Sequence, residues 1–148
     1  MCLDARHCPR RRFIAEQLQV GCFFHVMDQR LTSAGGLLNE AALRELWRRE
    51  GRQLTELDDL LDGGGLLSIL CASQRWLPAF QFEPDGTPRM DVAAIAHELE
   101  GAMDTAEILA WFACGNASLD GMTPIACLRP RPNAVLEVAR LDRFISSA

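Results

Sequence analysis

The chain has 148 residues and a net charge of −5, with 49% apolar and 24% charged residues. A chain of this length buries roughly 70% of its unfolded surface, so it can fold without disulfides as one domain or as two small lobes. No apolar run approaches the roughly 20 residues of a membrane span. The acidic balance argues against a protein whose whole surface binds nucleic acid.

The amino-terminal residues carry charge but no apolar stretch of signal type, because polar residues interrupt the segment at 16–19. We therefore expect a cytoplasmic protein. The six cysteines contain no C-x-x-C pair, and in a reducing compartment we expect free thiols. Cys2, His7 and Cys8 would make a weak metal site, so we expect neither a metal nor a cofactor.

The first predicted elements are helical. Apolar residues spaced four apart predict a helix over 11–30, and a loop follows at 32–36. Asn39 is a good N-cap for a helix that ends at Gly51. Thr55 predicts the start of a further helix, with Asp58 in the capping-box position.

Two strand-like runs, 66–71 and 76–82, predict a β-hairpin with its connection at 72–75. In the second run, alternation places Phe80 and Phe82 inward and Gln81 outward. A proline lacks the N–H that a central strand needs, so Pro78 predicts an edge strand or a bulge. We interpret this run as a joint between the hairpin and the helices that follow.

From residue 91 onward the sequence predicts helices again. Their start signals are Asp91, Asp104, Thr123 with Pro124, and Asn133. The inner face of the last helix is expected to carry Val135, Val138, Leu141 and Ile145. The predicted fold class is mainly α (α+β): a degenerate winged helix-turn-helix-like lobe with one hairpin, then a small helical C-terminal domain. The expected boundaries are 1–30 for a basic arm and first helix, 31–90 for the lobe, and 91–148 for the C-terminal domain.

The motifs of common enzymes are absent. His7, His25 and His97 lie far apart, and the glycine run at 63–67 lacks the lysine and spacing of a phosphate-binding loop. We expect no enzyme and no catalytic residue. A ligand-binding or catalytic site assembled from distant residues around His25 or His97 remains a less favoured alternative.

Residues 77–145 resemble a known family. The order helix, helix, hairpin, then L-P-A-F-Q-F and an E-P-D-G-T-P turn, together with W-F-A-C-G-N-A-S-L-D-G-M-T-P-I-A-C-L at 111–128, resembles the Xre/MbcA/ParS-type antitoxins. In that family the C-terminal domain reads Trp-Leu, a turn with Asn, Leu-x-Gly-x-Thr-Pro and a Leu. The pattern falls here on Trp111, Asn116, Leu119, Gly121, Thr123, Pro124 and Leu128. Val138 and Ala139 stand at the family's closing Val and Ala.

The resemblance implies that the C-terminal domain binds a partner toxin, commonly of the NAD-consuming RES-domain class, and blocks its active site. It also implies a homodimer whose amino-terminal part binds operator DNA and regulates its own operon. Arg140 and Arg143, in the terminal tail, are candidates for toxin contact. The alternative is a stand-alone, non-enzymatic interaction or regulatory protein that has lost DNA binding.

Basic residues give the candidates for DNA contact: Arg6, Arg10, Arg11, Arg12, Arg44 and Arg48. The helix in the position of a recognition helix, 55–62, carries four acids, which repel phosphates. The amino-terminal arginines are then either an arm that grips a groove or a solvated tail.

Overall fold

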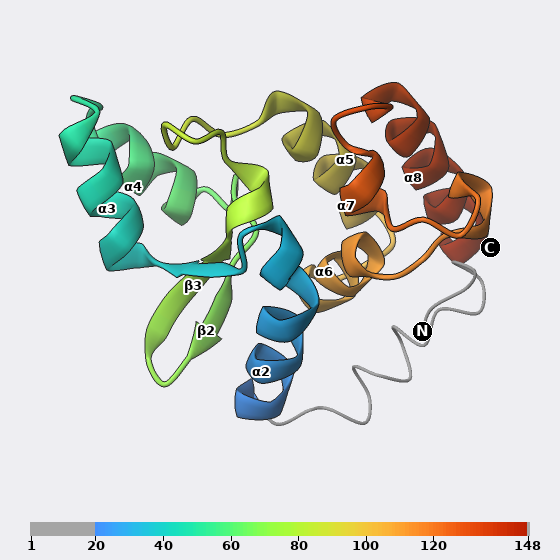
Figure 1. Ribbon diagram of the computed structural model, residues 1–148, viewed down its shortest axis with the longest axis horizontal. Helices are drawn as coiled ribbons and strands as arrows, with labels where there is room; N and C mark the ends of the chain where they lie inside the picture. Colours follow the sequence, from blue (N-terminus) through green and yellow to red (C-terminus); the bar gives the residue numbers. More distant parts are fainter. Residues whose placement is uncertain (1–19, 148) are drawn as a thin grey trace.

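The computed structural model describes residues 20–147 (Figure 1). Within this range the chain is mainly helical and carries a small three-stranded antiparallel sheet, as the coarse fold prediction requires. The helices are α2 (Val20–Leu31), α3 (Glu40–Arg49), α4 (Leu54–Asp62), α5 (Met90–Glu100), α6 (Thr105–Ala113), α7 (Pro124–Cys127) and α8 (Pro132–Ser147). The strands are β1 (Leu37–Asn39), β2 (Ile69–Cys71) and β3 (Gln74–Pro78), and single 3-10 turns form η1 (Thr32–Ala34), η2 (Ala79–Gln81) and η3 (Ala117–Leu119). Over the described range, no helix combines the length and apolar character that crossing a bilayer requires.

The sheet has the order β1-β3-β2, with both neighbours antiparallel to β3. The predicted hairpin is confirmed, although its connection is only the pair Ala72 and Ser73, both at positive φ. Strand β1 was not predicted, because its three residues were read as the approach to the Asn39 cap. Leu38 pairs with Leu77 across β3, and this pairing from a distant part of the chain creates the third strand.

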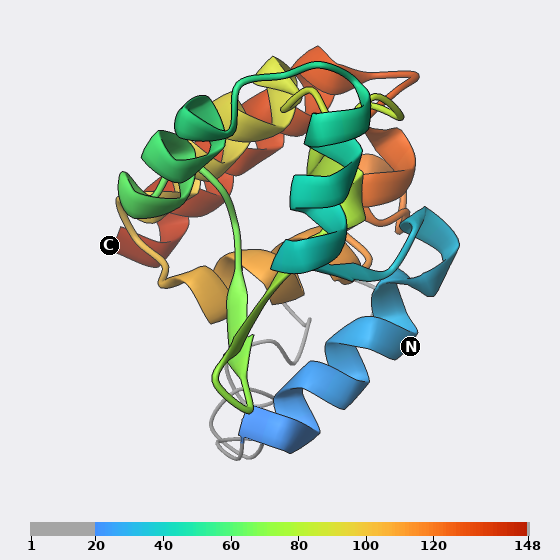
Figure 2. The same ribbon diagram turned by 90° about the vertical axis from the view of Figure 1, so that its left-hand side faces the viewer.

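Two apolar clusters hold the elements together. The smaller cluster lies in the sheet lobe, which we define as residues 37–82, and consists of Leu43, Trp47, Leu57, Leu77 and Phe82. The larger cluster gathers α2 and the helical block, defined as residues 90–147, in which α5 and α8 pack together. Figure 2 turns the α3–α4 side toward the viewer, with α5 and α8 behind it.

The segment between the two clusters departs from the strand prediction. Phe80 and Phe82 are both buried, as predicted, but Phe80 belongs to the larger cluster and Phe82 to the smaller. Gln81 was expected to face outward and is instead only 4% exposed. Its side chain accepts a hydrogen bond from the Leu67 amide and donates one to the Leu67 carbonyl, both at 2.8 Å. The strand ends at Pro78 and continues as η2, so the two-residue alternation of a strand does not apply to Gln81.

The prediction that Pro78 lies in an edge strand is wrong, because β3 is the central strand. Pro78 is the last residue of β3 and pairs with Leu37. The next amide, of Ala79, donates to the carbonyl of Gly36 at 3.0 Å. The central strand therefore tolerates the proline because it falls where the ladder ends.

Three of the predicted helix starts are confirmed by their capping bonds. Asn39, Asp104 and Thr123 each accept a hydrogen bond from the amide three residues ahead, at 2.7, 2.8 and 3.1 Å. Pro124 occupies the first position of α7, where its missing N–H has no helical partner to lose.

The other predicted starts are wrong by one residue or more. Helix α4 begins at Leu54 and not after a Thr55 cap, and α8 begins at Pro132, before Asn133. Helix α5 begins at Met90, so Asp91 lies inside it and pairs with Arg89 at 2.6 Å. Asp58 likewise binds Arg44 and makes no capping bond. The carboxylates of Asp58 and Asp91, which the local pattern assigned to helix capping, thus form ion pairs with arginines instead.

Candidate functional site

The turn that contains the family pattern closes on Asn116. The carbonyl of Asn116 accepts hydrogen bonds from the amides of Leu119 and Gly121, both at 2.9 Å, and its own amide donates to Met122 at 3.0 Å. Gly121 has a φ of +81°, a conformation that side-chain-bearing residues rarely adopt. The turn then leads directly into the Thr123 cap of α7.

A buried carboxylate that the sequence reading missed ties this turn to the last helix. Asp142, on α8, is 6% exposed. Its Oδ2 accepts two hydrogen bonds, one from Trp111 Nε1 at 2.7 Å and one from Asn116 Nδ2 at 3.2 Å. Trp111 and Asn116 are therefore joined through a residue outside the recognised pattern. The sequence signal that could have revealed this contact is Asp142 itself, an acidic residue on the otherwise apolar buried face of α8.

The family-pattern residues build the helical block from within. Trp111, Leu119 and Leu128 are each 1% exposed, and Pro124 is also buried. The structure brings these residues together with Asn116, Gly121 and Thr123 along one continuous path from α6 through α7.

Helix α8 presents an apolar stripe to solvent, which we define as Leu141, Phe144 and Ile145. The three side chains are 47%, 76% and 47% exposed, and their i, i+3, i+4 spacing places them on one face. The sequence assigned Leu141 and Ile145 to the buried face, and this assignment is wrong. The buried face instead runs through Val135, Val138, Ala139 and Asp142, because Asp142 must reach its two donors.

The two arginines predicted for toxin contact flank this region of α8. Arg140 lies 2.7 Å from Glu137, and Arg143 lies 3.0 Å from Glu98 on α5. Both arginine side chains are about half exposed. Arg143 packs so closely over the end of α5 that a Cβ on Gly101 would come within 2.7 Å of its Nε. Arg143 thus fixes the last turns of α8 against α5.

The candidates for DNA contact divide into two groups. Arg6, Arg10, Arg11 and Arg12 lie outside the described residues. On α3, Arg44 binds Asp58 of α4 at 2.6 Å, and this hydrogen bond raises the pKa of Arg44 above its ordinary value. Arg48 binds Glu45 at 2.7 Å. Both of the predicted DNA-contact arginines on α3 are therefore already engaged with carboxylates.

Helix α4 carries the opposite charge on its free face. Glu56, Asp59 and Asp62 are exposed and spaced three apart, so they share one side of the helix. An acidic face at this position repels a phosphate backbone. The structure therefore retains the acidic surface on α4 that the sequence indicated would repel DNA phosphates.

The two histidines among residues 20–147 lie on different helices. His25 is exposed on α2, and His97 is exposed on α5, where it lies 3.7 Å from Glu100. Among residues 20–147, no three His, Cys, Asp or Glu side chains are grouped as a metal would require. Cys71 and Cys127 are free, but Cys114 is disulfide-bonded, which corrects the expectation of free thiols at that position.

Comparison with known proteins adds no relative. No protein-family model matches the chain, and searches of curated proteins and of solved structures return no match.

Proposed function

We propose that this chain is an antitoxin-like protein that binds and neutralises a partner toxin of the RES-domain class. The observation that carries the proposal is the apolar stripe Leu141, Phe144 and Ile145, exposed on a helix that the family-pattern residues hold in place. An exposed apolar cluster with charged neighbours is typical of a protein-binding surface. Asp142 supports the proposal because it links Trp111 and Asn116 to the helix that bears the stripe.

The stripe can supply an anchor but not a complete interface. Burying the three side chains against a partner would contribute about 3–5 kcal/mol, given roughly 1.5–3 kcal/mol for each fully exposed apolar side chain. A micromolar complex needs about 8 kcal/mol. The remainder must come from surrounding contacts, and Arg140 and Arg143 are placed to form a polar rim around the anchor.

The arrangement of the sheet lobe supports the winged helix-turn-helix-like part of the proposal. The chain runs helix, strand, helix, helix and then a two-stranded hairpin. The second strand of the hairpin, β3, pairs with the earlier strand β1. In this interpretation α3 and α4 form the helix-turn-helix and β2–β3 the wing. Regulation of its own operon would then use this lobe together with the amino-terminal arginines.

A second candidate function keeps partner binding and removes DNA binding. It is favoured by the acidic face of α4 and by the ion pairs that engage Arg44 and Arg48. Binding of the chain to its own promoter DNA, measured by fluorescence anisotropy at several salt concentrations, separates the two candidates. A steep fall of affinity with salt supports operator binding. An affinity no higher than that for unrelated DNA supports the second candidate.

Toxin neutralisation is tested by co-expressing this chain with a RES-domain toxin. Wild-type chain should restore growth, and the Phe144→Ala variant should weaken the complex about tenfold, through loss of roughly 1–2 kcal/mol of burial. Met90→Ala is the matched control, because Met90 is 83% exposed but lies on α5, at the start of the helical block. No rescue by wild-type chain, or equal effects of the two variants, would contradict the proposal.

A further inference from the structure

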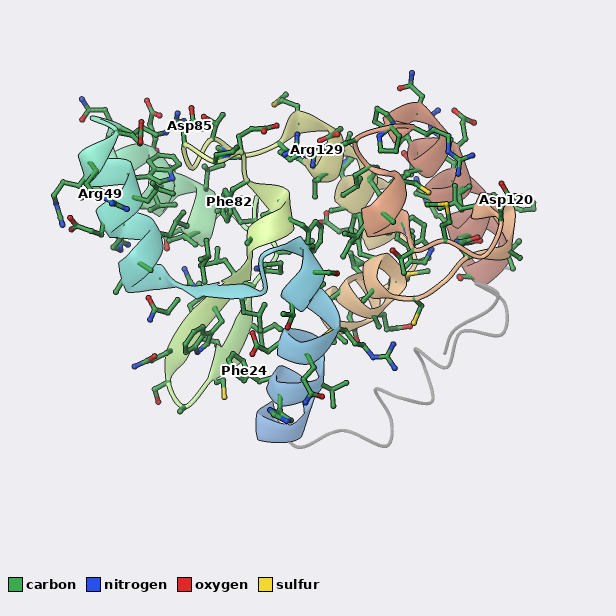
Figure 3. All side chains as sticks on the ribbon, viewed as in Figure 1. Phe24, Arg49, Phe82, Asp85, Asp120 and Arg129 are labelled. Atoms are coloured by element: carbon green, nitrogen blue, oxygen red, sulfur yellow. The ribbon has the colours of Figure 1, made fainter. Side chains whose placement is uncertain are left out.

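A hollow of about 420 Å³ lies where the sheet lobe meets α7. Phe80 and Phe82 line it from one side, and Ile125 and Leu128 from the other. Figure 3 labels Phe82 on the sheet lobe and Arg129 just beyond α7. The volume falls within the range of about 300–1,000 Å³ that small-molecule sites occupy, and such sites favour the junction of two structural units.

The charged residues that line this hollow are two arginines. Arg89 and Arg129 are among the residues that line it, and none of the lining residues is acidic. Arg89 is 8% exposed and is held by Asp91 through two hydrogen bonds, at 3.1 and 2.6 Å. Arg89 is therefore fixed in place and its charge is paired with that of Asp91.

Arg129 is held much more loosely. Its Nη2 lies 3.3 Å from Glu83 Oε2, and the two side chains are 65% and 40% exposed. An ion pair this open to water contributes little, so a competing carboxylate can displace Glu83 at small cost. Glu83 also lies 3.7 Å from Arg89 and can keep that contact when Arg129 turns toward a ligand.

We propose that this hollow, the junction pocket, binds a small molecule that carries an aromatic or branched apolar group and a carboxylate. The apolar group lies against Phe80, Ile125 and Leu128, and the carboxylate accepts hydrogen bonds from Arg129. Such a ligand touches both the sheet lobe and the helical block, so its binding stabilises their mutual placement. This site is separate from the α8 stripe and does not depend on the proposed toxin binding.

The test uses phenylacetate and its neutral isostere phenylacetamide, titrated into the purified full-length chain by isothermal calorimetry. Phenylacetate should bind about two- to fivefold more tightly than the amide, the ratio expected for an ion pair with a largely exposed arginine. Arg129→Gln should remove this preference. The matched control Arg49→Gln should keep it, because Arg49 is exposed on α3, away from the pocket lining.

A further variant tests the apolar part of the site. Ala126 is exposed and lines the pocket, so Ala126→Trp should fill it and abolish binding of both probes without lowering the melting temperature. The proposal is overturned if neither probe binds, if both bind equally, or if Arg129→Gln retains the preference for the carboxylate. Undiminished binding to a folded Ala126→Trp variant would also overturn it.

Discussion

Replacing Gln81 by leucine should destabilise the chain strongly, although leucine has a similar size and is more apolar. The Gln81 side chain forms two 2.8 Å hydrogen bonds with the Leu67 backbone, and both residues are at most 6% exposed. Leucine would leave the Leu67 amide and carbonyl buried without these partners. At roughly 1–3 kcal/mol for each such group, the expected loss is about 2–4 kcal/mol.

The loss is large against the roughly 5–15 kcal/mol stability of an ordinary domain. It should lower the melting temperature by about 5–15 °C, given about 2–4 °C per kcal/mol for a chain of this size. Urea denaturation followed by circular dichroism gives the free energy of unfolding directly. Gln74→Leu is the control, because Gln74 is exposed on β3. If the two variants differ by less than about 0.5 kcal/mol, the assigned role of the Gln81 amide is refuted.

Three further predictions concern other parts of the chain. In urea unfolding, Gly86→Ala should lower the free energy of unfolding more than Gly64→Ala. Both glycines have positive φ, but a Cβ at Gly86 would lie 3.0 Å from the Trp47 indole, whereas a Cβ at Gly64 would meet no atom. Asp142→Ala should cost about 2–4 kcal/mol of unfolding free energy, because two buried donors lose their acceptor; wild-type stability would contradict the described network. Hydrogen bonds from the Thr87 side chain and backbone lower the pKa of Asp85 below its ordinary 3.8. The ionised form is thus favoured in the folded state, and its stabilising effect is present above that ordinary value and lost as pH falls through the folded pKa. In an NMR titration, Thr87→Val should move the pKa of Asp85 upward, and an unchanged value would refute the assignment.

The sequence by itself determined the local features of this protein. The mainly helical character, the hairpin and the caps at Asn39, Asp104 and Thr123 were all predictable. Each cap bonds to an amide three residues ahead, so everything it needs lies in one short stretch of chain. Phe80 and Phe82 are buried as predicted, but the strand alternation on which that prediction rested does not hold at Gln81.

Only the tertiary structure decided the features that join distant segments. Gln81 turns inward because its partner, Leu67, lies 14 residues away in sequence. Asp142 is buried because Trp111, 31 residues earlier, donates to it, and this contact turns Leu141 and Ile145 of α8 outward. A helical pattern gives the spacing of a face but not which neighbour the face meets. The candidate binding stripe was therefore hidden in the sequence, because the same apolar residues fit a buried face equally well until the partners of Asp142 were in place.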